Sequence, residues 1–445
     1  MLLIWLGVGI VSAEASYGII PLIVLALRRK GRYAEILLGF LFILIISDSR
    51  QYSLSFAVSL KNVYIVLMAL ILYIDRSKFQ PMSNLIKGFV PFFVISTIAL
   101  IQAPGDELFI SVQKMLSYIL LLLVVPNFLL LSYRLQGESF LRNLVWLGTL
   151  ILFLGIVFRI LNFDFIIVKG RFAGVFGNPN GLGIFCLLFW MLAAVIHNRF
   201  TNLFSRQEIY FIFGVIGAAL ILSGSRSSLV GLIIFLVFGR LYKLSNVFGF
   251  LSLVILIVSY EFLTLNINSI IISLGLEQYF RLETLETGSG RLVAWDFAWD
   301  NIQNHFFLGR GFAHTENLYI KYSEMLRALG HEGHAHNVYL TFWLNSGLIG
   351  LFCFFILGLI PLFLGAARQS NLAMPLLLGA MFSMNFESWL TASLNPFTIL
   401  LWCSLTLLTN PHFVEASERW RSNNNPSEEA EDTLPDVNPK PLPTG

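Results

Sequence analysis

The chain has 445 residues, of which 56% are hydrophobic and only 12% are charged. Soluble domains have about a quarter charged residues, so this composition excludes an ordinary soluble protein and indicates a chain surrounded mostly by lipid. The formal net charge is only +3, and the basic residues are spread over short connections, which argues against nucleic acid as a partner. The three cysteines lie inside apolar runs without metal-ligand or redox spacing.

Apolar runs recur along the whole chain and do not alternate with polar residues. Backbone groups in hydrocarbon must be hydrogen-bonded within their own segment, so these runs predict helices rather than barrel strands. The expected fold is all-α, a polytopic transmembrane helix bundle of roughly 12 spans with one long extracytoplasmic loop subdomain. The runs cover residues 2–27, 33–46, 56–74, 88–101, 111–131, 141–161, 181–196, 209–222, 227–238, 247–265, 338–364, 372–390 and 396–408. Whether residues 2–27 form one helix or two, and on which side the chain begins, stays open.

Basic residues occur in alternate connections, and short loops rich in lysine and arginine are typically cytoplasmic. The remaining connections, residues 162–180, 223–226, 266–337 and 391–395, are therefore expected together on the outer side. The predicted cytoplasmic residues are Arg28, Arg29, Lys30, Arg32, Arg76, Lys78, Lys87, Arg134, Arg142, Arg199, Arg206, Arg240, Lys243 and Arg368.

This alternation predicts four parts of the chain. Residues 1–265 form transmembrane helices with short loops, residues 266–337 an extracytoplasmic loop subdomain, and residues 338–410 the C-terminal transmembrane helices. Residues 411–445 are acidic and rich in proline, which predicts a disordered cytoplasmic tail. Within the outer subdomain, Trp295, Ala298, Trp299 and Ile302 recur at helical spacing and predict an amphipathic helix on the membrane surface.

Two motifs stand before predicted spans on the outer side. Residues 170–180 combine glycines and Arg171 with Asn178-Pro179-Asn180, where Asn180 can cap a helix and free N–H groups can face an anion. The alternative is a plain loop with Arg171 among the lipid headgroups. Arg226 stands close to hydrocarbon, where an arginine is costly and generally faces a cavity or a partner, although snorkelling to the interface is the alternative.

Three histidines, His331, His334 and His336, lie within six residues of one another. Together with Glu332 they allow a metal site, whereas a lone His336 held by Asn337 or a carboxylate would serve as a proton acceptor. The spacing of a closed zinc site is usually clearer, which favours the proton acceptor.

A carboxylate and a further arginine are also candidate site residues on the predicted outer side. Arg291 follows a Gly-Ser-Gly turn, and Glu387 lies near the outer end of the penultimate predicted span. A carboxylate in the membrane is costly and usually functional, but Glu387 could equally be a structural partner of an arginine.

Taken together and in their order along the chain, these motifs resemble those of the O-antigen ligase and O-antigen polymerase superfamily of lipid-linked glycan transferases. The resemblance covers residues 171–393, and nothing in residues 1–161 carries a motif that can be placed. It depends on Arg-Phe-Ala-Gly followed by Asn-Pro-Asn, the Ser225-Arg226 turn, Gly290-Arg291 with Trp295, and His336-Asn337 leading into residues 347–350. The extra His331 and His334 depart from the family pattern.

The resemblance implies a multi-pass glycosyltransferase of the bacterial inner membrane that acts on the extracytoplasmic face. It would move an undecaprenyl-diphosphate-linked saccharide onto a glycan or lipid acceptor, without a metal or other cofactor, beside polysaccharide assembly proteins. The implied catalytic residues are His336, Arg226 and Arg291. The implied substrate-binding residues are Arg171, Asn178, Asn180, Asn337, Glu387 and His334. No Asp-x-Asp pair that could hold a divalent metal occurs in residues 266–337.

A polytopic transporter or flippase, of a small anion or a lipid-linked glycan, is the alternative function. Such proteins tend to have repeated halves and ion sites near the bilayer midplane, whereas the polar residues here gather on one face and no internal repeat is visible. The sequence leaves open the choice between ligase and polymerase, the sugar and acceptor, and the oligomeric state.

Overall fold

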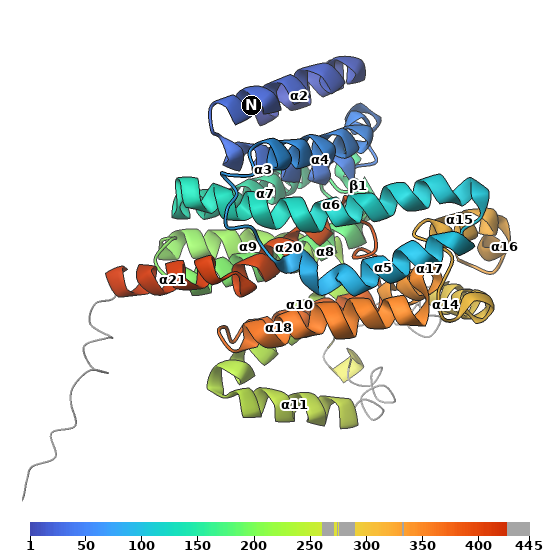
Figure 1. The fold of residues 1–445 in the computed structure, drawn as a ribbon. Coiled ribbons are helices and arrows are strands. Elements are labelled where there is room, and N and C mark those ends of the chain that lie inside the picture. The colour runs from blue at the N-terminus through green and yellow to red at the C-terminus, as the bar shows by residue number, and fades with distance from the viewer. Residues whose placement is uncertain (260–270, 274, 276–289, 332, 425–445) are drawn as a thin grey trace, which may run out of the picture.

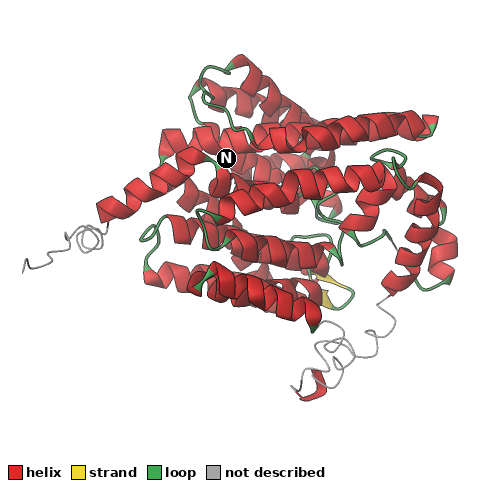
Figure 2. Ribbon diagram, turned by 60° about the horizontal axis from the view of Figure 1, so that its bottom comes forward, coloured by secondary structure: helices red, strands yellow, loops and turns green. Residues whose placement is uncertain are grey.

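The computed structural model describes residues 1–259, 271–273, 275, 290–331 and 333–424. In these residues the chain is almost entirely helical, and the strands found there are β1 (Ile167–Val168) and β2 (Arg171–Phe172), which pair as a short antiparallel hairpin. Figure 2 shows this hairpin in yellow among red helices. The expected all-α class is confirmed.

Eight helical segments of the described chain are long and apolar enough to cross a membrane, and four shorter apolar helices accompany them. The long segments are Tyr52–Ile74, Leu85–Gln102, Gly105–Gln136, Glu138–Ile160, Pro179–Arg199, Arg206–Ser223, Arg226–Leu244 and Val338–Ala367. The shorter helices are Leu2–Val11, Tyr33–Ser47, Asn246–Val258 and Ala373–Met384. The polytopic helix bundle predicted from hydropathy is thereby confirmed.

The first apolar run forms two helices, which answers the question that the sequence left open. Helix α1 covers Leu2–Val11 and α2 covers Ala13–Arg29. Ser12 separates them with an extended backbone (φ −152°), and its side chain accepts a hydrogen bond from the Ala15 amide at 3.1 Å. Ser12 therefore acts as an N-cap that starts a second helix.

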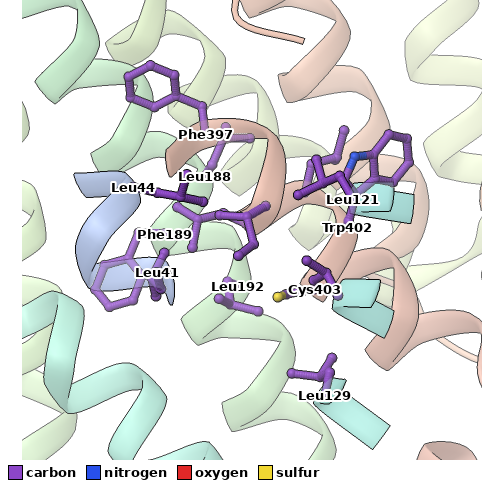
Figure 3. Close-up of a cluster of buried hydrophobic side chains, with 14 of the residues drawn as sticks. Leu41, Leu44, Leu121, Leu129, Leu188, Phe189, Leu192, Phe397, Trp402 and Cys403 are labelled. Carbon is purple, nitrogen blue, oxygen red and sulfur yellow. The ribbon is translucent and has the colours of Figure 1, made fainter. Parts of the chain in front are cut away.

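The centre of the bundle consists of α3 (Tyr33–Ser47), α6 (Gly105–Gln136), α8 (Pro179–Arg199) and α20 (Pro396–Thr409). Figure 3 shows how side chains from these helices meet, among them Leu44, Leu121, Leu188 and Trp402. All four are almost completely buried. Helices that are apolar on every side are typical of such a central position, and α8 and α20 are buried along nearly their whole length.

Other helices surround this centre (Figure 1). They are α4 (Phe56–Ile74), α5 (Val90–Ala99), α7 (Glu138–Ile160), α9 (Arg206–Ser223), α10 (Arg226–Leu244), α11 (Asn246–Val258), α17 (Val338–Phe352), α18 (Ile360–Ala367) and α19 (Ala373–Met384). Helix α17 continues through a π-helical segment, Cys353–Leu359, into α18. Pro361, which has no N–H to donate, stands where the π-helical segment passes into α18.

Connections predicted to share the basic side contact one another. Arg28 pairs with Asp75 at 2.8 Å, and Arg142 forms an ion pair with Glu208. Arg199 donates to the Leu408 carbonyl at 3.1 Å. Each of these contacts joins helix ends that are distant in sequence.

The predicted disorder from Pro411 onward is wrong for residues 411–424. They form α21 (Pro411–Asn424), whose Phe413 is fully buried against Tyr133 with ring centroids 4.9 Å apart. The Trp420 indole donates to the Thr201 carbonyl. These apolar side chains give the segment a packed face, whereas the acidic and proline-rich composition begins after it. Residues 425–445 lie outside the described residues.

The helix predicted from Trp295 to Ile302 is present as α14 (Arg291–Ile302), and its position on the outer membrane surface stays a prediction. It is followed by η7 (Gln303–His305), α15 (His314–Lys321) and α16 (Ser323–Ala328). Its buried face consists of Ala294, Ala298 and Ile302, whereas Trp299, expected on that face, is 46% exposed. The buried face packs with Tyr319 of α15 in a small core of its own. Much of the preceding segment, residues 266–270, 274 and 276–289, lies outside the described residues.

Two glycines allow this outer segment to pack closely on α17. Gly347 has a φ of 70° inside α17, and a side chain there would clash with the Phe307 carbonyl. Gly309 has a φ of 67°, and a Cβ there would clash with the α17 backbone. The Arg310 amide donates to the Leu344 carbonyl at 3.1 Å. The outer segment is therefore held by backbone contacts to a membrane helix.

We predict that α14 and α21 lie on opposite sides of the membrane, because basic loops are typically cytoplasmic. In intact cells with a permeabilised outer envelope, a membrane-impermeant maleimide should label an Asp300→Cys variant at once. It should label a Glu418→Cys variant only after lysis of the inner membrane. Both positions are exposed, and the native Cys186, Cys353 and Cys403 are buried, so background labelling should be low. Equal labelling of both variants before lysis would contradict this topology.

Candidate functional site

The β1–β2 hairpin positions Arg171. Its two central turn residues, Lys169 and Gly170, have φ values of 50° and 76°, as expected for the tight turn that joins two short antiparallel strands. The Arg171 guanidinium donates to the Ser223 carbonyl from Nε at 3.0 Å and from Nη2 at 2.8 Å, and to Asn180 Oδ1 at 3.0 Å. Arg171 thus joins the end of α9 to the start of α8.

The start of α8 differs in one detail from the prediction. The N-cap is Asn178, whose Oδ1 accepts from the Gly181 amide at 2.7 Å, and not Asn180. Pro179 takes the first helical position, which leaves Asn180 free to turn toward Arg171. The Gly177 amide, one of the N–H groups predicted to face an anion, donates to the Asp48 carboxylate at 3.2 Å. Burial raises the pKa of Asp48 to about 6, against the opposing effect of this hydrogen bond.

Arg226 is the first residue of α10. Gly224 has a left-handed backbone (φ 57°) that ends α9, and Ser225 precedes α10 as its N-cap residue. The connection is so short that Arg226 is held at the same end of the bundle as Ser223, the acceptor of Arg171. Sequence analysis placed these motifs on one side, and the structure brings them together.

Glu387 joins three of the predicted site residues. Its Oε1 accepts from Arg291 Nη2 at 2.8 Å and from Asn180 Nδ2 at 2.8 Å. Its Oε2 lies 3.0 Å from His336 Nδ1. Glu387 is only 8% exposed. Burial alone would raise its pKa, but the hydrogen bond and charge of His336, together with the charge of Arg291, lower the pKa, so the carboxylate is ionised.

The position of Glu387 corrects the predicted span of residues 372–390. Helix α19 ends at Met384, and Glu387 lies in the connection that leads to α20. The Trp389 indole donates to Ser383 Oγ at 2.9 Å, and Asn395 caps α20 by accepting from the Phe397 and Thr398 amides. These polar contacts stabilise the connection, so the helix ends at Met384 although apolar residues follow it.

His336 and Asn337 have different roles. His336 has a left-handed backbone (φ 47°), which is uncommon for a residue with a side chain and marks a locally constrained position. Asn337 is the N-cap of α17, accepting from the Leu340 amide at 3.0 Å, and its own amide donates to Ser388 Oγ at 2.9 Å. These contacts support the backbone at His336. Asn337 does not line the cavities that His336 borders, and its contact with substrate stays a prediction.

A first cavity, of about 470 Å³, lies beside this cluster. Five cationic side chains among the described residues line it, from the hairpin, α10, α14 and α16. They are Lys169, Arg171, Arg226, Arg291 and Arg327, and they are joined there by Asn180 and His336. So high a positive charge, distributed around one hollow, is suited to a multiply charged anion. Lys169 and Arg327 were not among the residues predicted for the site. Lys169 could have been predicted, because it stands in a connection assigned to the outer side, where positive charge is scarce.

A second cavity, of about 480 Å³, is also lined by His336. Glu387, Asn178 and His334 line it as well, together with Lys61 and Lys114 from the N-terminal half, where the sequence showed no motif. His336 therefore borders two cavities, one strongly basic and one of mixed polarity.

His331 and His334, the other two histidines near His336, contact each other within one short loop. His331 Nε2 lies 3.0 Å from the His334 carbonyl oxygen. Burial lowers the pKa of both side chains, which disfavours their charged forms. Within the described residues, no three His, Cys, Asp or Glu side chains are grouped so that they could hold a metal ion. Glu332, named above as a candidate ligand, lies outside those residues.

A comparison with known protein families bears on the function of the chain. Residues 211–355 match the family model described as O-antigen ligase. The O-antigen ligase match runs from α9 into the segment after α17 and contains Arg226, Arg291 and His336, and it confirms the resemblance. A search of curated proteins found no match. The O-antigen ligase match supports a membrane glycan-processing function of the ligase or polymerase type.

We predict that a Glu387→Ala variant is less stable by roughly 1–3 kcal/mol, because Arg291 and His336 lose their shared acceptor. Both residues border a cavity that water can enter, so the loss should stay below that of a fully enclosed ion pair. Thermal unfolding of the purified protein in detergent would measure it. The Asp300→Ala variant is the control, because Asp300 is an exposed carboxylate on α14. Equal stability of the two variants would contradict the structural role of Glu387.

Proposed function

We propose that the protein is a glycosyltransferase of the bacterial inner membrane that acts on the extracytoplasmic face. It moves a saccharide from undecaprenyl diphosphate onto a glycan or lipid acceptor, as O-antigen ligases and polysaccharide polymerases do. The observation that carries this proposal is the position of His336 between the basic first cavity and the second cavity. The family match over residues 211–355 supports the same class of reaction.

The first cavity suits the diphosphate of the donor. When the bond between sugar and diphosphate breaks, negative charge grows on the leaving oxygen, and cations already held in place stabilise it. Arg226 and Arg291 both line this cavity, and guanidinium groups offer permanently charged, paired donors that match phosphate oxygens. Arg291 is oriented by Glu387, and its guanidinium also lies 5.7 Å from the centre of the Phe386 ring. We assign both arginines to the diphosphate.

His336 is the proton acceptor in this proposal. Its Nδ1 is engaged by the Glu387 carboxylate, which orients the ring and stabilises the imidazolium that forms. Its Nε2 forms no hydrogen bond with any described residue. The acceptor hydroxyl oxygen attacks the anomeric carbon of the donor, the bond from that carbon to the diphosphate breaks, and the hydroxyl proton passes to Nε2. Undecaprenyl diphosphate leaves with the bonding electrons.

The second cavity gives room for the acceptor. Amide and hydroxyl side chains line it, including Asn62, Gln113 and Ser117, and such groups both donate to and accept from sugar hydroxyls. Asn178 and His334, expected at the substrate, border this cavity, whereas Arg171 and Asn180 border the first. Donor and acceptor would thus approach His336 from two sides.

We predict that His336→Ala lowers glycan transfer by about 10²–10⁴-fold, as loss of a general base typically does. Arg226→Lys and Arg291→Lys should also lose most activity, since lysine keeps the charge but not the paired donors. Transfer of the native lipid-linked glycan would be measured in membranes that contain each variant at equal abundance.

The matched control is Arg159→Lys, the same replacement at an exposed arginine outside the cavities. Near-normal transfer by the His336→Ala variant would contradict its role as base. Near-normal transfer by both lysine variants would remove the diphosphate site and favour the transporter alternative.

The proposed reaction requires no divalent metal, because arginines supply the positive charge at the leaving group. We therefore expect purified protein to transfer glycan at an unchanged rate after dialysis against a chelator. Loss of transfer in chelator, with recovery after addition of zinc or magnesium, would contradict the proposal and direct attention to His331, His334 and His336 as ligands.

A further inference from the structure

A third cavity, of about 630 Å³, lies in the outer segment, at the N-terminal end of α6 and beside α14 and α15. Figure 1 shows these elements together at one end of the bundle. Three amide side chains line the cavity, from Asn301, Asn304 and Asn317. Amides offer both donors and acceptors, so they suit a ligand with many hydroxyl groups. The proposed reaction does not use this cavity.

Arg310 points to a ligand in this cavity. Its Nε is buried and has no hydrogen-bond partner, and no ion pair joins the guanidinium to any described residue. Most buried polar groups in proteins have a partner, so a buried unpaired guanidinium nitrogen calls for an explanation. The backbone of Arg310 is held by its bond to the Leu344 carbonyl, and the next amide, of Gly311, donates to the Asn345 carbonyl at 2.8 Å. The side chain is thus presented from a constrained loop.

The charges around the cavity are balanced. Asp106 and Glu107 oppose Arg310 and Lys321. Two histidines, His305 and His314, also line the cavity. Burial lowers the pKa of both side chains, that of His314 to about 4, which disfavours their charged forms. His314 Nδ1 lies 3.2 Å from a carboxylate oxygen of Glu107. A balanced set of charged donors and acceptors disfavours a small ion and favours an uncharged, polyhydroxylated ligand.

Helix α15 separates this cavity from the second one. His314, Asn317 and Lys321 follow one face of α15 and line the third cavity. Thr315 and Glu316 line the second cavity, which contains His336. Thr315 is bound to α17 through Asn345 Oδ1 at 2.7 Å, so the wall between the cavities is attached to a membrane helix. A chain longer than one sugar unit could reach from the reaction centre past this wall.

We infer that the third cavity is a second saccharide-binding site, which holds sugar units remote from the bond that is made, with Arg310 as its principal hydrogen-bond donor. The inference rests on the proposed function only for the source of the saccharide. The site accounts for the unpaired guanidinium nitrogen, for the amide lining and for the position beside the second cavity.

Binding of a free saccharide tests this site without requiring transfer. The probe is the glycan released by mild acid from the lipid-linked glycan of the producing cells, and equilibrium dialysis against purified protein measures its Kd. Arg310→Gln should weaken binding about 10-fold or more, because a hydrogen bond from a charged donor is lost. Asn304→Trp changes an exposed cavity residue, so it should fill the cavity without disturbing the buried core.

Two controls separate this site from the reaction centre. Arg159→Gln makes the same change outside the cavities and should bind the glycan normally. Arg291→Lys should lose transfer but keep free-glycan binding. Thermal unfolding of each variant would show that it is folded. The inference is overturned if wild type does not bind the glycan, if both cavity variants bind normally, or if Arg291→Lys loses binding. Glycan binding by a wild-type protein that transfers nothing would contradict the proposed function and leave this site standing.

Transfer kinetics then identify the source of the saccharide. If the site holds the glycan of the donor, Arg310→Gln should raise the KM for lipid-linked glycan about 10-fold or more, with kcat and the KM for acceptor unchanged. If it holds the acceptor glycan, the KM for acceptor should rise instead. A fall in kcat with both KM values unchanged would overturn the inference, because Arg310 would then act on the transition state.

Discussion

A single buried carboxylate organises the site. Glu387 accepts from Arg291 and Asn180 and pairs with His336, which come from three separate stretches of the chain. An ionised carboxylate removed from water is stable only when it is paired and hydrogen-bonded, so the geometry of each partner depends on the others. The start of α8, the start of α14, the loop before α17 and the connection after α19 are therefore held in one arrangement. The first two cavities border this arrangement on either side.

The membrane environment explains why the polar groups are concentrated at helix ends. Within hydrocarbon, backbone groups form hydrogen bonds inside their helices, and the side chains between α3, α6, α8 and α20 are apolar. Few polar groups are therefore left there to bind a substrate or transfer a proton. At the helix ends around the site, backbone amides and carbonyls lack helical partners, and arginine and carboxylate side chains bond to some of them. Arg171 at the end of α9 is one such case. Five cations around one hollow would repel one another, and a bound multiply charged anion would relieve that repulsion.

Where sequence reasoning failed, tertiary contacts outweighed local signals. Residues 411–424 read as polar tail, yet Phe413 and Trp420 pack against Tyr133 and Thr201 and stabilise α21. The apolar stretch after Met384 read as helix, yet α19 ends there because side-chain hydrogen bonds around Trp389 and Asn395 satisfy the turn. Pro179 moved the cap of α8 from Asn180 to Asn178, since proline occupies the first helical position. The first two outcomes are not visible in hydropathy or in local spacing, whereas Asn178 directly before Pro179 is a local signal for the start of a helix.

The sequence by itself determined the membrane class, the helical fold, the alternation of basic loops and the identity of Arg226, Arg291 and His336 as site candidates. It could do so because hydropathy and charge placement act along the chain, and arginine or histidine outside the membrane stands out against an apolar background. Only the tertiary structure decided that Lys169 and Arg327 join the first cavity and that Lys61 and Lys114 border the second. It also gave Glu387 its partners and Arg310 its unpaired buried nitrogen. These facts depend on which helix ends become neighbours, and helix packing in the bundle settles that through contacts between residues far apart in the chain.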